Sequence, residues 1–137
     1  MRRFAVCTLL MRDDGRVLSV SRGPTRLDWG LPGGLVDNDE TFQNAALREL
    51  REETGIALST PNVFHPAPLR PVFRQWCAGD LCTTFVPSGD YRAVEVGDAS
   101  GFEGYVDWLE PRQLVSANCS FAGYNALLFR KLNIDFD

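Results

Sequence analysis

The sequence predicts an α/β fold in which a mixed β-sheet lies between helices. Stretches rich in β-branched and aromatic residues precede and follow one uninterrupted helical segment, residues 41–54. A second segment, residues 121–132, repeats apolar side chains at helical spacing. The chain has 137 residues, of which 45% are hydrophobic, and it shows no internal repeat or linker. We therefore expect one domain over residues 1–137.

The first predicted element is a β-hairpin. Residues 4–11 are apolar and partly β-branched, and residues 16–21 alternate apolar with polar side chains. The Asp-Asp-Gly sequence at residues 13–15 is typical of the turn between two such strands. Residues 22–28 follow as a predicted loop, because Gly-Pro interrupts the strand pattern there.

The central helix carries three carboxylates near its end. Ala, Leu, Arg, Glu and Gln dominate residues 41–54, no proline interrupts them, and Gly55 follows as a left-handed stop. At about 100° per residue, Glu49, Glu52 and Glu53 share the face that is expected to pack inward. Acids there meet the negative end of the helix dipole and repel one another. A solvated acidic surface is the alternative, but a divalent cation such as Mg²⁺ or Mn²⁺ would offset both penalties.

A second hairpin and a terminal helix are predicted beyond the central helix. Residues 59–71 contain four prolines and are expected to be irregular. Residues 72–77 and 81–86 are aromatic and β-branched around Ala-Gly-Asp, which indicates two paired strands. The remaining predicted elements are a short strand, a second strand, a helical turn and a packing helix, at residues 91–96, 105–109, 110–115 and 121–132.

The residues around the acids form a specific pattern. Gly34 is followed after five residues by Glu40, and after seven more by Arg-Glu-Leu at residues 48–50. One residue further on comes Glu52-Glu53, and one more leads to Gly55-Ile56. At all nine specified positions this segment resembles the Nudix box of the Nudix hydrolase superfamily. The resemblance implies a Nudix-type α/β/α sandwich and a hydrolase that acts on phosphorus-containing acid anhydrides.

The resemblance also implies a site for Mg²⁺, with Mn²⁺ as a substitute. The expected metal ligands are the three helix acids, the backbone carbonyl before the box and one acid from a later loop: Glu49, Glu52, Glu53, Gly33 and Glu103. In many family members the later acid comes just before a strand that carries tryptophan, and Glu103 precedes Trp108 by five residues. Asp107 or Glu95 could serve instead, and Asp98 is a further candidate for this ligand or for a general base.

The expected catalytic residues are the same helix acids together with an arginine: Glu49, Glu52, Glu53 and Arg48. The family assigns Arg48 the role of orienting carboxylates, so we do not expect it to touch substrate, and Glu40 is expected to support the site. Carboxylates around a divalent cation suit hydrolysis of a phosphoanhydride, because the cation neutralises diphosphate charge and activates water. Which acid accepts the proton of that water differs among Nudix enzymes and stays open.

The expected substrate is a nucleoside diphosphate linked to another moiety, of the nucleoside triphosphate, ADP-ribose or nucleotide sugar type. Candidate contacts to its phosphates are arginines in two predicted loop and strand regions: Arg22, Arg26, Arg70 and Arg74. The alternative is a Nudix-fold module that senses a nucleotide by binding it without catalysis. A third hypothesis is an isomerase of the same fold, which would need an additional reactive cysteine or acid.

Charge and cysteine content exclude several other classes. The formal net charge of −4 argues against a basic surface for nucleic acid. The four cysteines have no zinc-ligand spacing and are expected to be reduced, mostly buried thiols. The apolar run near residue 4 is too short for a membrane span and lacks a signal-cleavage pattern, so we expect a cytoplasmic location. Dimers are frequent in the resembling family, which allows a homodimer.

Overall fold

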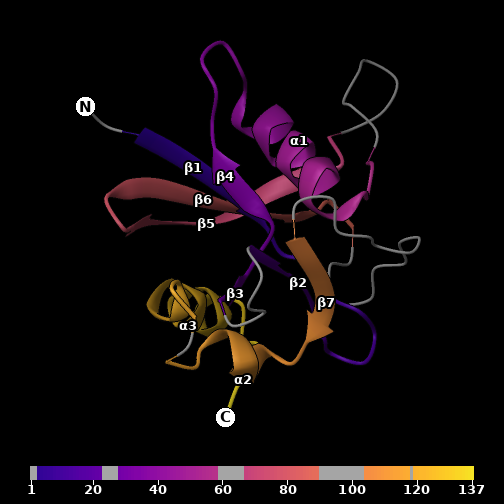
Figure 1. Ribbon diagram of the computed structural model, residues 1–137, viewed down its shortest axis with the longest axis vertical. Coiled ribbons are helices and arrows are strands. Elements are labelled where there is room, and N and C mark those ends of the chain that lie inside the picture. Colours follow the sequence, from indigo (N-terminus) through magenta and orange to yellow (C-terminus); the bar gives the residue numbers. More distant parts are fainter. Residues whose placement is uncertain (1–2, 23–27, 59–66, 90–103, 118) are drawn as a thin grey trace.

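The computed structural model describes residues 3–22, 28–58, 67–89, 104–117 and 119–137 (Figure 1). In chain order the elements are β1 (Arg3–Thr8), β2 (Val17–Arg22), β3 (Trp29–Gly30), β4 (Gly33–Leu35), α1 (Phe42–Thr54), β5 (Leu69–Cys77), β6 (Asp80–Pro87), β7 (Gly104–Leu109), α2 (Pro111–Leu114) and α3 (Ala122–Lys131). The strands form two sheets, with the orders β4-β1-β6-β5 and β3-β2-β7. Strands β1 and β6 run parallel and the other pairs are antiparallel, so the larger sheet is mixed, as predicted.

Helices cover the two faces of the larger sheet. Strand β1 shows why, because its neighbouring side chains point to opposite faces. Val6 packs with Ala45 and Ala46 of α1, whereas Cys7 belongs to the cluster that contains Leu128 and Phe129 of α3. Figure 1 shows α1 on one side of the strands and α3 on the other. The predicted α/β/α arrangement is confirmed.

The predicted hairpin of residues 4–11 and 16–21 is wrong for most of its length. A single antiparallel bridge joins Met11 to Val17, next to a hydrogen bond from the Leu18 N–H to the Leu10 carbonyl. Before that point β1 pairs with β4 and β6, while β2 pairs with β3 and β7 in the other sheet. The turn residues fix only the tip, and partners distant in sequence decide where each strand goes.

Helix α1 begins and ends at the predicted signals. The Thr41 hydroxyl accepts a hydrogen bond from the Asn44 N–H at 3.1 Å, which caps the first turn. Gly55 ends the helix with φ of 75° and donates its N–H to the Arg51 carbonyl, as a left-handed glycine cap does. The buried stripe between these caps consists of Ala45, Ala46, Leu50, Glu53 and Thr54.

The second hairpin is confirmed, and it is longer than predicted. Residues 69–71 were expected to be irregular but form the start of β5, with a bulge after Pro71. The Gln43 side chain accounts for this, because its amide donates to the Leu69 carbonyl and accepts from the Leu69 N–H. Strand β7, the turn α2 and helix α3 lie where they were predicted. Within the described ranges, no helix is both long and apolar enough to cross a membrane.

Candidate active site

Two glycines in β4 bring the backbone against α1. A Cβ added to Gly33 would lie 2.1 Å from the Val6 carbonyl oxygen, and one added to Gly34 would lie 2.6 Å from Glu49 Oε1. Both distances are far below normal contact. The double glycine therefore lets β4 pair tightly with β1 while the Glu49 carboxylate lies directly over Gly34.

Glu53 is the buried acid of the cluster. Its side chain is 3% exposed, and Oε1 accepts a hydrogen bond from the Gly33 N–H at 2.8 Å. Burial of a carboxylate is costly unless it is hydrogen-bonded. This hydrogen bond joins two residues that are 20 positions apart in the sequence. The end of α1 is thus fixed to β4, the strand in which the box begins.

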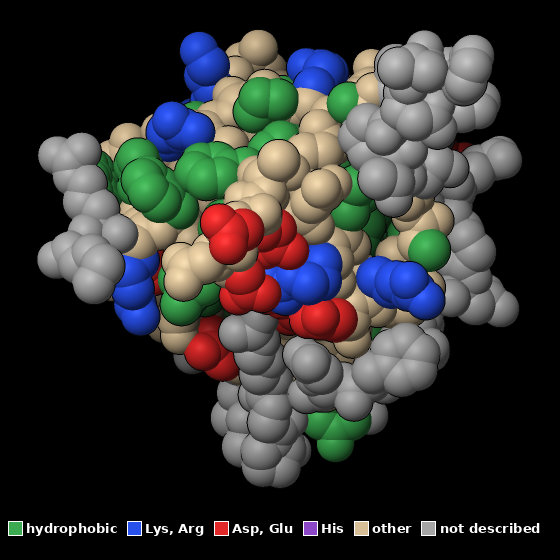
Figure 2. Space-filling model, turned by 90° about the horizontal axis from the view of Figure 1, so that it is seen from above, with side chains coloured by type: hydrophobic (Ala, Val, Ile, Leu, Met, Phe, Trp, Pro, Cys, Tyr) green, Lys and Arg blue, Asp and Glu red, His purple; other side chains and the backbone are tan. Residues whose placement is uncertain are grey.

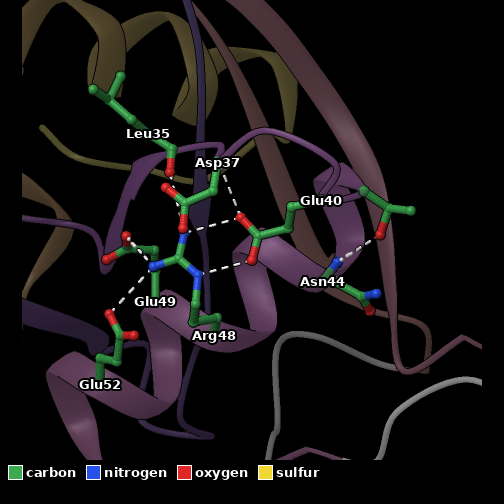
Figure 3. A network of polar contacts seen from close by, with 8 residues as sticks. Leu35, Asp37, Glu40, Asn44, Arg48, Glu49 and Glu52 are labelled. Carbon is green, nitrogen blue, oxygen red and sulfur yellow. Dashed lines mark hydrogen bonds and ion pairs between the residues drawn. The ribbon is translucent and has the colours of Figure 1, made fainter.

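Arg48 is the centre of a carboxylate network (Figure 3). Its Nε and Nη2 atoms donate to both oxygens of Glu40, at 2.8 and 3.0 Å. Its Nη1 atom donates to Glu49 Oε1 at 2.9 Å and to Glu52 Oε2 at 3.3 Å. Nη2 also donates to the Leu35 carbonyl at 3.2 Å. One guanidinium therefore hydrogen-bonds three carboxylates, and its Nη2 atom also lies 3.5 Å from Asp37 Oδ2.

The charges in this network shift the ionisation of two groups. Hydrogen bonds from Arg48 lower the pKa of Glu40, and the Asp37 N–H lowers it further, although burial acts in the opposite direction. The Glu40 hydrogen bond likewise raises the pKa of Arg48, with a smaller contribution from Glu49. Both groups are consequently charged throughout the neutral range.

The lowered pKa of Glu40 predicts a pH-dependent contribution to stability. A carboxyl whose pKa is lower in the folded state stabilises the protein above its ordinary pKa, and this contribution is lost as the pH falls through the folded value. We expect Glu40→Gln to reduce the free energy of unfolding by about 1–3 kcal/mol at pH 7, and the difference from wild type to shrink as the solution becomes acidic. Thermal unfolding of both proteins across pH measures this, and a pH-independent difference would contradict it.

The acid cluster has donors suited to a hard divalent cation. Glu40, Glu49, Glu52 and Glu53 outnumber the single guanidinium among them, and carboxylate oxygens are the ligands that Mg²⁺ and Mn²⁺ prefer. Figure 2 shows acidic side chains gathered around basic ones on the face above α1. Among the residues with described positions, no three ligating side chains already converge on one point. The donor chemistry fits the cation, while Arg48 holds Glu49 and Glu52 in the present arrangement.

The later acid expected to complete the site cannot be placed. Glu103, Glu95 and Asp98 lie outside the described residues. Asp107 is described, in β7, but its neighbours Val106 and Trp108 pack with Leu50 of α1. Because side chains alternate along a strand, Asp107 points to the face away from α1, so the structure disfavours this alternative.

The candidate arginines whose side chains are described, Arg70 and Arg74, do not lie at the acids. Arg26 lies outside the described residues, and Arg22 ends β2 opposite Gly104. Arg70 is exposed in β5. Arg74 donates to the Thr83 hydroxyl and lies over the Phe42 ring, 5.5 Å from its centroid. Phe42 is the first residue of α1, so Arg74 lies near the opposite end of the helix from Glu53.

A cavity of about 400 Å³ lies beside the double glycine. Its walls come from β1, β2, β3, β4, the β5–β6 hairpin and the start of α3, and include Cys7, whose side chain faces α3. Gly33 and Gly34 line it as well, so only the backbone of β4 separates the cavity from the acids of α1. The aromatic side chains that line it are Trp29, Phe121 and Tyr124.

The sequence did not predict this cavity. Phe121 and Tyr124 were assigned to a packing helix, and Asn125 was not singled out. Asn125 is 2% exposed, and its Nδ2 donates to the Leu114 carbonyl at 3.0 Å. Its Oδ1 accepts no hydrogen bond within the described part of the chain. The sequence signal that could have pointed to the cavity was Asn125, a polar residue in the stripe of α3 that faces inward.

Comparison with known proteins assigns the chain to a family. A model of the NUDIX domain matches residues 1–125. The chain belongs to the Nudix hydrolase family. A MutT-like protein from Streptomyces ambofaciens is 31% identical over 116 residues, which are 83% of this chain and 68% of that protein.

Two further Nudix proteins show how far the likeness extends. An RNA pyrophosphohydrolase from Dinoroseobacter shibae is 35% identical over 86 residues, which are 62% of this chain and 50% of that protein. A Nudix hydrolase family member from Chromobacterium violaceum aligns with a TM-score of 0.69 at 17% identity, covering 97% of this chain and 78% of that one. The likeness to the Chromobacterium violaceum protein is one of fold. The chain spans only half of the RNA pyrophosphohydrolase.

Proposed function

We propose that this Nudix protein is a Mg²⁺-dependent pyrophosphohydrolase. Its substrate would be a nucleoside diphosphate linked to another moiety, of the nucleoside triphosphate, ADP-ribose or nucleotide sugar type. The observation that carries the proposal is the position of the double glycine, which has a carboxylate cluster on one face and a cavity on the other. A substrate whose diphosphate lay across the edge of β4 would have its phosphoanhydride next to the acids and its nucleoside in the cavity.

The chain's own residues would perform distinct tasks in this reaction. Glu49, Glu52 and Glu53, with the Gly33 carbonyl, would hold Mg²⁺, which neutralises diphosphate charge and lowers the pKa of a bound water. Arg48 orients Glu49 and Glu52 through hydrogen bonds to their carboxylates. Glu40 fixes Arg48 by a two-point contact. Substituting each acid in turn would identify the one that accepts the water proton and would test the role proposed for Glu103.

The cavity would hold the nucleoside. Trp29, Phe121 and Tyr124 offer aromatic surface for a base, and Asn125 offers a side-chain oxygen that accepts no hydrogen bond within the described part of the chain. We expect Asn125→Ala to raise KM for the best nucleotide substrate by about tenfold, with a smaller change in kcat. Leu127→Ala is the control, because Leu127 is exposed on the same helix. An unchanged KM in Asn125→Ala would contradict the placement.

A substrate panel tests the proposed activity. Purified protein would be assayed with nucleoside triphosphates, ADP-ribose, NADH, dinucleoside polyphosphates, nucleotide sugars and a short RNA with a 5′-triphosphate, each with Mg²⁺ and with Mn²⁺. Metal-dependent release of a nucleoside monophosphate or sugar phosphate from a small substrate is expected. Hydrolysis of the RNA alone would overturn the expectation that nucleic acid is not a partner.

The second candidate function is a nucleotide-sensing module without catalysis. The acid cluster argues against it, because a module that only binds has no need of four neighbouring carboxylates. Tight, metal-insensitive nucleotide binding with no product from any compound of the panel would favour it. The cytoplasmic location, the single domain over residues 1–137 and the homodimer stay predictions, and sedimentation of the purified protein would test the last of them.

A further inference from the structure

The cavity beside β4 also contains a pair of thiols. Cys7 and Cys82 both line it, and their sulfur atoms are 3.9 Å apart. The Cys7 sulfur lies 3.1 Å from the Thr84 hydroxyl, which lies 2.6 Å from the Tyr124 hydroxyl. The proposed reaction uses neither thiol. The thiols are therefore available for a separate reaction, and a small molecule in the cavity can reach them.

We propose that Cys82 is an oxidative modification site, which a small peroxide reaches through the cavity. Cys82 thiolate attacks one oxygen of hydrogen peroxide, the O–O bond breaks, and the sulfur becomes a sulfenic acid. The sulfur loses two electrons and the peroxide gains them, and the departing hydroxide takes a proton from solvent to form water. The cavity then carries a polar group where it was apolar.

The surroundings of Cys82 favour it as the reacting thiol. A hydrogen bond with Cys7 lowers the pKa of Cys82, and the Tyr124 hydroxyl lowers it further, although burial acts in the opposite direction. Burial raises the pKa of Cys77, which lines the same cavity. The thiolate is the nucleophilic form of cysteine. Cys82 also lies 3.9 Å from a second sulfur, that of Cys7, in the cavity wall, and the two observations together mark Cys82 as the reacting thiol.

The strand register argues against a disulfide between Cys82 and Cys7. Cys82 pairs with Ala5, and Cys7 pairs with Thr84, so the two cysteines are diagonal neighbours on adjacent strands. Parallel strands lie about 4.8 Å apart and rise about 3.3 Å per residue, so the Cα atoms of such neighbours are about 8 Å apart, whereas disulfides need about 4.4–6.8 Å. A disulfide would require β1 and β6 to shift, and these strands form the centre of the sheet.

Oxidation of Cys82 should weaken ligand binding. This consequence rests on the proposed function, in which the cavity holds the nucleoside. The observation that points to a ligand there is Asn125, which lines the same cavity, is 2% exposed and has a side-chain oxygen that accepts no hydrogen bond within the described part of the chain. A sulfenic acid oxygen would occupy space and present polarity to that ligand.

Peroxide titration with mass spectrometry tests the proposal. The folded protein would be oxidised in small steps, unfolded in the presence of dimedone to trap sulfenic acid, and digested. Cys119 is the matched control, because it is 7% exposed and Cys82 is 9% exposed, but Cys119 does not line the cavity. We expect the Cys82 adduct to form at least about tenfold faster than the Cys119 adduct. Equal rates, or modification of Cys77 alone, would overturn the proposal.

Nucleotide protection and variants separate this proposal from the proposed function. AMP, GMP, CMP and UMP would be added in turn, and at least one should slow the Cys82 reaction. Cys82 oxidation that no nucleotide slows would leave the modification site standing and contradict a nucleoside in the cavity. Peroxide should weaken nucleotide binding in wild type and Cys119→Ser, but not in Cys82→Ser or Cys82→Ala, whose folding would be checked by thermal unfolding.

Discussion

Glu53→Gln is expected to lower kcat by at least about a hundredfold while the protein stays folded. The amide has the same shape as the carboxylate, and its oxygen can still accept the Gly33 N–H. The substitution therefore removes the charge at a buried position and keeps the packing. Steady-state kinetics with Mg²⁺, together with thermal unfolding, measures the two effects separately.

Asp39→Asn is the matched control for this prediction. It makes the same carboxylate-to-amide change at an exposed residue outside α1. Its φ of 65° is one that asparagine also adopts readily. We expect kcat of this variant to stay near that of wild type. Near-normal turnover in Glu53→Gln would remove Glu53 from the catalytic residues.

Alanine substitutions at the two glycines of β4 are expected to have different effects, one on stability and the other on catalysis. At Gly33 the new Cβ would overlap the Val6 carbonyl and the Cys7 Cα, and neither backbone group can move without breaking the β1–β4 pairing. We expect Gly33→Ala to reduce the free energy of unfolding by about 3 kcal/mol or more. Urea unfolding measures this.

At Gly34 the new Cβ would meet the Glu49 carboxylate, which is the far end of a flexible side chain. We expect Gly34→Ala to lower kcat by about ten- to a hundredfold, as disturbance of supporting contacts does in other metal sites, with less than about 1 kcal/mol lost in stability. Gly89→Ala is the control, because no atom lies within 4 Å of its added Cβ. Equal losses of stability in Gly33→Ala and Gly34→Ala would contradict this distinction.

Local signals in the sequence predicted the elements that depend on neighbouring residues. Helix α1 is the clearest case, because Thr41 and Gly55 cap it and the positions between them form one stripe. Arg48 and Glu40, both singled out by the Nudix box, contact each other within a short segment of the chain, and their roles in the reaction stay predictions. Strand pairing was less accessible, because β1 pairs in parallel with β6 across more than 70 residues. Nothing near residue 10 signals that the chain changes sheets there.

The cavity shows the limit of sequence patterns most directly. Six regions of the chain supply its walls, and Tyr124 has the same helical spacing whether it packs in a core or borders a space. The sequence did not predict the hydrogen bond between Glu53 and Gly33 either, although it singled out both residues. Their roles were inferred from the family pattern, while the hydrogen bond depends on how closely β4 approaches α1.

Binding of Mn²⁺ followed by electron paramagnetic resonance tests the central claim, that the carboxylates at the end of α1 hold a divalent cation. Wild type, Asp39→Asn and a Glu52→Gln/Glu53→Gln double variant would be titrated without nucleotide. Wild type and Asp39→Asn should bind Mn²⁺ with the same affinity, and the double variant should lose at least about tenfold in affinity. Equal Mn²⁺ affinity in all three proteins would contradict the account.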